Sequence, residues 1–184
     1  MPEKIKPEEL RIEKLEPKHN DLLNGFTTSS KELKDFLIED ALNNQKQKLS
    51  VTFLWFYENN LVGYVTLLTD KINLEGNLKQ FFREKDIHYK SLPALKIGRL
   101  CVHEDFLRRS IGRLMVLFSI QKSNEISENM AGCRFITLDA KRNENRELDS
   151  IHFYKKLGFE VLKERNKGTM PMYLDLVNNL KFGV

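Results

Sequence analysis

Apolar and polar positions alternate at the start of the chain and then change period. Residues 9–15 alternate in a way that predicts an opening strand with one buried face. In residues 30–47 apolar side chains recur three and four positions apart, which predicts an amphipathic helix. Ser29 and Glu32 are spaced as a capping box, so we expect the helix to begin there.

Two apolar runs and a longer polar stretch follow. Residues 50–57 and 61–68 are rich in β-branched and aromatic side chains and flank a short polar turn, which predicts an antiparallel hairpin. Residues 71–93 are polar and ambiguous, with a pattern that favours an insertion with some helix. Residues 95–102 are apolar again and predict another strand.

The second half of the chain continues the alternation of helices and strands. Helices are predicted at 108–128 and 148–157, the second ended by Gly158, and strands at 133–138, 159–162 and 172–177. The strand–helix–strand crossover in the middle requires one parallel pair, whereas the hairpins give antiparallel pairs. The predicted class is therefore α/β (α+β), with a central mixed, mostly antiparallel sheet and helices on both faces, in a single domain over residues 1–184.

Composition narrows the function classes. Hydrophobic residues make up 41% of the chain, enough for a sizeable core. No apolar run reaches the roughly 20 residues of a membrane span, and the N-terminus lacks a signal-peptide pattern, so we expect a cytoplasmic protein without a membrane partner. Cys101 and Cys133 lie in apolar runs and are interpreted as buried free thiols, with no metal site. The net charge of +4 permits an anionic partner, such as a phosphorylated cofactor or RNA.

The segment with the most chemical information is residues 100–114, where a strand ends and a helix begins. The first N–H groups of a helix lack internal acceptors and carry partial positive charge. Ser110 and Gly112 are small enough to let a phosphate approach the backbone. Arg108, Arg109 and Arg113 add full charges. The pattern predicts an anion site.

This segment resembles motif A of the Gcn5-related N-acetyltransferase (GNAT) superfamily. Gly112 matches the last small position of the motif, whereas Ser110 stands where the first glycine is usual and Leu107 where Gln or Arg is usual. These departures are expected to loosen diphosphate binding, and Arg108 and Arg109 to compensate. Residues 150–159 resemble the late motif, an apolar residue, Phe-Tyr and then Lys-Leu-Gly-Phe.

The resemblance implies an acyltransferase that moves the acetyl group of acetyl-CoA to a primary amine by direct attack in a ternary complex. In that family two central parallel strands splay apart around the pantetheine arm of coenzyme A. Tyr154 then becomes the candidate general acid, and Glu104 or His103 the candidate base. The resemblance assigns the coenzyme to Leu100, Cys101, Val102, Arg108, Arg109, Ser110, Ile111, Gly112, Arg113 and Asn145.

A narrower resemblance concerns the acceptor. Residues 26–45, 62–64 and 93–102 are similar to toxin-type acetyltransferases, which acetylate the amino group of aminoacyl-tRNA. This resemblance leaves the acceptor open among tRNA, a protein and a small amine. It also leaves open whether the protein forms a homodimer and whether it has an antitoxin partner. A tRNA acceptor predicts a basic surface, with these candidates: Lys46, Lys48, Lys79, Arg83, Lys85 and Arg99.

Three alternatives remain at this point. A non-catalytic acyl-CoA-binding module would lack a base, and Tyr154→Phe separates it from an enzyme. A cofactor-free RNA-binding domain needs exposed aromatics, but Phe53, Trp55, Phe56 and Tyr64 lie in dense apolar runs typical of a core. Cys101 as an acyl-carrying nucleophile lacks a neighbouring base in sequence.

Overall fold

The computed structural model describes residues 2–142 and 150–178 and contains a mixed sheet. Its seven strands run in the order β1-β2-β3-β4-β5-β7-β6. The pairs β1–β2, β2–β3, β5–β7 and β6–β7 are antiparallel, and β4–β5 is the parallel pair. This confirms the expected α/β class and its mixed, mostly antiparallel sheet.

The predicted helices and strands occur in the predicted order with shifted ends, and the structure adds a short helix at Asn20–Leu23 that the sequence did not predict. The strands are β1 (Leu10–Lys14), β2 (Val51–Tyr57), β3 (Asn60–Asn73), β4 (Ser91–Val102), β5 (Phe135–Lys141), β6 (Glu160–Val161) and β7 (Thr169–Asp175). The helices are α1 (Asn20–Leu23), α2 (Lys31–Asp35), α3 (Ala41–Lys46), α4 (Gly76–Arg83), α5 (Ile111–Asn129) and α6 (Ser150–Lys156). Short 3-10 turns lie at Pro7–Glu9, Pro17–His19 and Glu104–Phe106.

Contacts divide the chain into two compact units. The described parts of the first are residues 2–68 and 97–119, and those of the second are residues 69–96, 120–142 and 150–178. The chain passes between them within β3, β4 and α5. The expectation of one domain over residues 1–184 stays a prediction.

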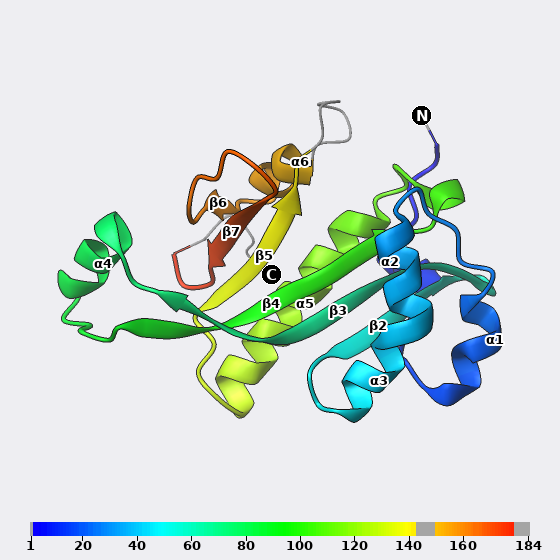
Figure 1. The fold of residues 1–184 in the computed structure, drawn as a ribbon, viewed down its shortest axis with the longest axis horizontal. Helices are drawn as coiled ribbons and strands as arrows, with labels where there is room; N and C mark the ends of the chain where they lie inside the picture. Colours follow the sequence, from blue (N-terminus) through cyan, green and yellow to red (C-terminus); the bar gives the residue numbers. More distant parts are fainter. Residues whose placement is uncertain (1, 143–149, 179–184) are drawn as a thin grey trace. The chain divides into compact units, whose positions relative to one another are not determined.

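In the first unit, one face of the sheet is covered by the predicted amphipathic helix. That helix comprises α2, a π turn at Phe36–Asp40, and α3, and Figure 1 shows it crossing β2 and β3. Leu37 and Ala41 have no exposed surface, and they share a core cluster with Leu54 and Tyr64. The period seen in the sequence therefore places the apolar stripe against the sheet, as expected.

The start of this helix corrects one prediction. The N-cap is Ser30, not Ser29, because the Ser30 side chain accepts a hydrogen bond from the Leu33 N–H at 3.4 Å. Glu32 therefore does not stand at the third helical position that a capping box requires. Ser29 and Ser30 both carry a hydroxyl that can cap a helix, and in the structure Ser30 is the one that does so.

The first half of α5 packs on the opposite face of the first unit. The Phe118 ring lies edge-on to Phe53 and Trp55, at centroid distances of 5.0 and 5.6 Å. A Cβ added at Gly63 would lie 2.4 Å from Met115 Cε and 2.6 Å from the Cys101 carbonyl oxygen. Glycine is therefore what allows β3, β4 and this helix to approach so closely.

The second unit explains the ambiguous residues 71–93. They form the end of β3, helix α4 and the start of β4, and Figure 1 shows α4 at the tip of the arm that these strands form. Phe82 of α4 has no exposed surface and packs in a cluster with Ile72, Leu74, Ala94 and Phe135. The segment is thus a strand–helix–strand excursion with its own core. No helix among the described residues is long and apolar enough to cross a membrane.

Candidate functional site

The end of β4 is the first component of the predicted site. Leu100 and Val102 are half-buried, whereas Cys101 is 5% exposed and lies in the core beneath α2 and α3. Its thiol donates to Thr28 Oγ1 at 3.3 Å, and burial raises the pKa of the thiol. The sulfur is therefore held as a neutral thiol, which argues against the nucleophile hypothesis.

His103 follows β4 and is a structural residue rather than an exposed one. Its side chain is 13% exposed. The ring lies edge-on to Phe26 and Phe106, at 5.5 and 5.8 Å. Nδ1 accepts from the Asp105 N–H at 3.3 Å, which assigns the proton to Nε2, 3.1 Å from Thr27 Oγ1. Both ring nitrogens are engaged, so His103 is a poor base.

Glu104, the other candidate base, begins the 3-10 turn Glu104–Phe106 and is exposed. Its backbone N–H donates to the Thr27 carbonyl at 3.0 Å, and the His103 N–H donates to the Val62 carbonyl at 2.8 Å. The backbone at this point is therefore fixed while the carboxylate faces solvent. Its catalytic role stays a prediction.

The loop before α5 has an unusual backbone. Arg108 has a φ of 62° and Ser110 a φ of 71°, and Arg109 between them is not left-handed. Left-handed conformations are unfavourable for residues with a Cβ, which explains why glycine is usual at the position of Ser110 in motif A. Left-handed residues in such a turn can direct neighbouring backbone N–H groups toward one side, as an anion-binding concavity requires.

The sequence predicted a helix that begins at Arg108, but α5 begins at Ile111, directly after this loop. The Leu114 N–H donates to the Ser110 carbonyl at 3.1 Å, which makes Ser110 the residue before the first helical turn. By helical geometry the N–H groups of Ile111, Gly112 and Arg113 have no acceptor within the helix. The loop and the first turn together therefore present several N–H donors and the positive end of the helix dipole.

The three arginines of the motif are not equivalent. Arg109 Nε donates to the Glu3 carbonyl at 3.1 Å, and the Ile5 N–H donates to the Arg109 carbonyl at 3.1 Å. The Arg109 guanidinium also lies over the rings of Tyr57 and Phe106, at 5.0 and 5.5 Å. Arg109 is thus engaged with its own fold, which weakens its assignment to the coenzyme.

Arg108 and Arg113 are exposed and are better placed than Arg109 to meet an anion that approaches from solvent. Leu107, where the motif usually has a long polar side chain, is 50% exposed. The cationic contribution to an anion site at this loop is therefore expected from Arg108 and Arg113.

Tyr154 belongs to the second unit and lies on α6. It is 8% exposed, between the rings of Phe153 and Phe159 at 5.0 and 5.6 Å. Burial raises the pKa of its phenol, so the hydroxyl keeps its proton at any physiological pH. Gly158, with a φ of 82°, ends α6 as predicted. Asn145, the remaining candidate, lies outside the described residues.

Two threonines that sequence reasoning missed fasten the end of β4. Thr27 and Thr28 precede α2 and bond His103 and Cys101, which are 76 and 73 positions away in the chain. No local pattern marks such a pair, so only the fold reveals it. Among the described residues there is no group of three or more His, Cys, Asp or Glu side chains that could hold a metal ion.

Comparison with family models identifies one family. A family model described as "Acetyltransferase (GNAT) family" matches residues 19–159. No curated protein matches the chain. KacT, solved as a variant with one tyrosine replaced by phenylalanine, is 18% identical, with a TM-score of 0.74 and coverage of 92% of this chain and 96% of that chain.

Two structures of AtaT are also similar. AtaT complexed with acetyl-methionyl-tRNAfMet is 21% identical, with a TM-score of 0.70, covering 88% of this chain and 93% of that chain. A Tyr-to-Phe variant of the AtaT toxin, bound to the C-terminus of the antitoxin AtaR and acetyl-CoA, is 20% identical with a TM-score of 0.70, covering 94% and 97%. At these identities the likenesses show a shared fold.

Proposed function

Because the chain belongs to the acetyltransferase (GNAT) family and so uses acetyl-CoA to acetylate an amine, we propose that its acceptor is the amino group of aminoacyl-tRNA. The donor half of this reaction is supported by one observation above all, the left-handed residues Arg108 and Ser110 directly before the first turn of α5. The acceptor half is supported by AtaT, a protein of the same fold solved with acetyl-methionyl-tRNAfMet.

The coenzyme fits the anion site at the start of α5. We assign its diphosphate to the amides of Ile111, Gly112 and Arg113, with charge from Arg108 and Arg113. Preformed backbone donors need no reorganisation when the ligand binds, and a linked diphosphate can use several of them at once. Acetyl-CoA supplies the activated acetyl group.

The end of β4 would hold the reacting end of the coenzyme. The backbone groups of Leu100, Cys101 and Val102 can pair with an extended pantetheine arm as another strand would, because such pairing uses only N–H and C=O groups. A backbone N–H near Cys101 or Val102 directed at the acetyl oxygen would stabilise the developing negative charge, an effect worth roughly 3 kcal/mol per donor elsewhere.

The acceptor amine must be neutral when it attacks. We assign the removal of its proton to water or to Glu104, the exposed carboxylate directly after β4. An α-amino group next to an ester loses its proton more readily than a lysine amine, so aminoacyl-tRNA requires little help from a base. The engagement of His103 at both nitrogens is consistent with such an undemanding acceptor.

Tyr154 is assigned to the leaving sulfur. Its buried phenol stays protonated and can donate to the thiolate as the carbon–sulfur bond breaks. The aromatic contacts with Phe153 and Phe159 fix the ring, so removal of the hydroxyl alone would test chemistry rather than packing.

The proposed acceptor is tested by acetyl transfer from labelled acetyl-CoA to a panel that contains charged tRNAs, uncharged tRNA, polyamines and peptides. We expect label on charged tRNA and none on the uncharged form, with release of N-acetyl amino acid after mild alkaline hydrolysis of the ester. Efficient transfer to a peptide or polyamine, with charged tRNA unmodified, would replace the proposed acceptor while leaving the family assignment intact.

A further inference from the structure

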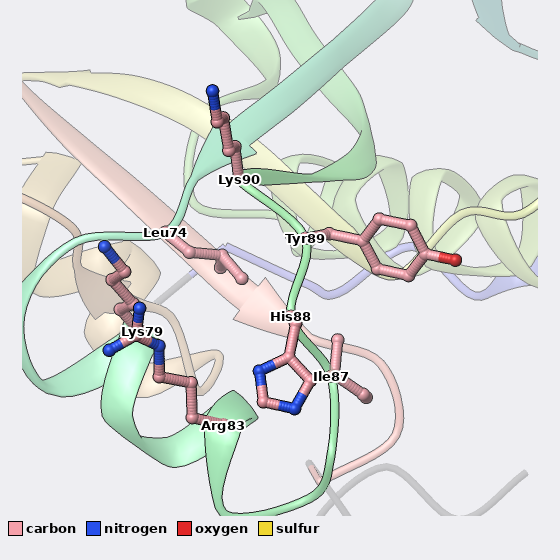
Figure 2. A pocket seen from close by; sticks show the side chains of 7 residues that line it. All are labelled: Leu74, Lys79, Arg83, Ile87, His88, Tyr89 and Lys90. Carbon is pink, nitrogen blue, oxygen red and sulfur yellow. The ribbon is translucent and has the colours of Figure 1, made fainter.

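The arm that carries α4 contains a second basic site. A pocket of about 240 Å³ lies between α4 and the segment that returns to β4. Figure 2 shows the side chains that line it: Leu74, Lys79, Arg83, Ile87, His88, Tyr89 and Lys90. No carboxylate is among them, so the lining is cationic over an apolar floor.

The pocket has a firm base. The Leu74 N–H donates to the Lys90 carbonyl at 2.9 Å, which joins the two ends of the segment that contains α4. The Ile87 N–H donates to the Phe82 carbonyl at 2.9 Å. Phe82 is fully buried and lies edge-on to Phe135 at 5.8 Å. The helix that presents the charges is therefore anchored in the core of its unit.

The charges in the pocket are not neutralised by the protein. Lys79 and Arg83 are four positions apart, so they share one face of α4, where like charges repel. Within the described residues, none of the ion pairs involves Lys79, Arg83 or Lys90. The nearby carboxylates of Glu84 and Asp86 bond Gln80 and His88 instead, at 3.1 and 2.9 Å.

The size of the pocket indicates its occupant. Sites for whole small molecules usually measure about 300–1,000 Å³, so a pocket of about 240 Å³ fits a single group rather than a coenzyme. Lysine and arginine are usual contacts of nucleic-acid phosphates, and such contacts position the nucleic acid without reading its bases. We propose that Lys79 and Arg83, whose side chains lie together in Figure 2, bind a backbone phosphate of the acceptor RNA; this inference rests on the proposed function.

The test measures binding of uncharged tRNA by fluorescence anisotropy across a salt series, which requires no catalysis. Lys79→Gln and Arg83→Gln are each expected to weaken binding about three- to tenfold and to reduce the slope of log K against log salt by about 0.7–0.9. Lys122→Gln is the matched control, because it also removes one lysine charge from the second unit, but this lysine pairs with Glu125 at 2.6 Å and lies outside the pocket. It should leave affinity within about twofold.

Kinetics then separate this inference from the function on which it rests. The pocket variants should raise KM for charged tRNA and leave KM for acetyl-CoA unchanged, with wild-type circular dichroism and melting temperature. Equal affinity and salt slope in wild type and both pocket variants would overturn the inference while transfer to tRNA persists. A raised KM for acetyl-CoA with unaltered tRNA binding would reassign the pocket to the coenzyme. A wild-type chain that binds no tRNA and acetylates another amine would refute both proposals.

Discussion

Gly63 provides the sharpest test of how the fold maintains the donor site. In Gly63→Ala the new Cβ would lie 2.6 Å from the Cys101 carbonyl oxygen and 2.4 Å from Met115 Cε. The methionine end can turn away, but a carbonyl in a central strand cannot move without displacing β4. Overpacking of a core costs about 1–3 kcal/mol, and we expect the upper part of that range, about 2–3 kcal/mol.

Gly98→Ala is the matched control on the same sheet. Its added Cβ would lie 2.6 Å from Leu68 Cδ2, the end of a flexible side chain, and 3.7 Å from the Thr66 carbonyl. The leucine can rotate, and loss of glycine flexibility in the unfolded chain stabilises by about 0.4–1 kcal/mol where the conformation suits. We therefore expect Gly98→Ala to change stability by less than about 1 kcal/mol.

The assay combines urea unfolding with calorimetry of acetyl-CoA binding. A loss of about 2–3 kcal/mol in Gly63→Ala corresponds to a drop of roughly 4–12 °C in melting temperature for a chain of this length. Because the clash displaces the strand assigned to pantetheine, coenzyme affinity should also fall, whereas Gly98→Ala should retain it. Equal stability and coenzyme affinity in the two variants would refute the reasoning about the immobile carbonyl.

Three further predictions concern single side chains. Tyr154→Phe should lower kcat about 100-fold or more with acetyl-CoA affinity kept, measured by steady-state kinetics and calorimetry, and an unchanged kcat would remove the tyrosine from the mechanism. Ser110→Gly should raise unfolding free energy by about 0.5–1 kcal/mol, as the relief of left-handed strain exceeds the added freedom of the unfolded chain, while Ser110→Ala should not. The pKa of Asp175 is lowered: burial opposes its charge, but the bonds from Arg134, the Val177 N–H and Asn178 outweigh burial. Its stabilisation is therefore present above the unfolded pKa of 3.8 and lost as pH falls through the lower folded value. Asp175→Asn should lower the free energy of unfolding by about 1–2 kcal/mol at neutral pH. Urea unfolding at several pH values should also show a smaller loss of stability between neutral and acid pH than in wild type. A loss equal to that of wild type would contradict this assignment.

Hydrophobic period predicted most of the elements, but it missed α1, left residues 71–93 ambiguous and did not show where the elements end. The stretch 30–47 has a strong apolar stripe, so the helix was clear in the sequence. By contrast, β3 extends to Asn73 through polar residues such as Asp70, whose carboxylate accepts from Thr137 Oγ1 at 2.6 Å. That partner lies 67 positions away, so no local pattern could indicate that a charged residue continues the strand.

In the candidate site too, features that depend on neighbouring residues could be predicted from the sequence, whereas contacts between distant residues could not. The candidate anion site near Ser110 was suggested by small and basic residues that follow a strand within one short segment, and it stays a prediction. The engagement of Arg109 with Glu3 and Tyr57 could not, since it depends on parts of the chain about 50 and 100 positions away. Burial of His103 likewise depends on Thr27 and Phe26.

Two hydrogen bonds, from Arg109 to the Glu3 carbonyl and from the Ile5 N–H to the Arg109 carbonyl, hold the N-terminal stretch against the loop before α5 and stabilise that loop. The Ile5 side chain is 3% exposed, so its burial also holds the N-terminal stretch in place. Expression tags or proteolytic trimming at this end would then disturb the turn that we assign to the diphosphate, so preparations that differ only in their first few residues are expected to differ in coenzyme affinity. Purified material is best compared with its leading residues intact.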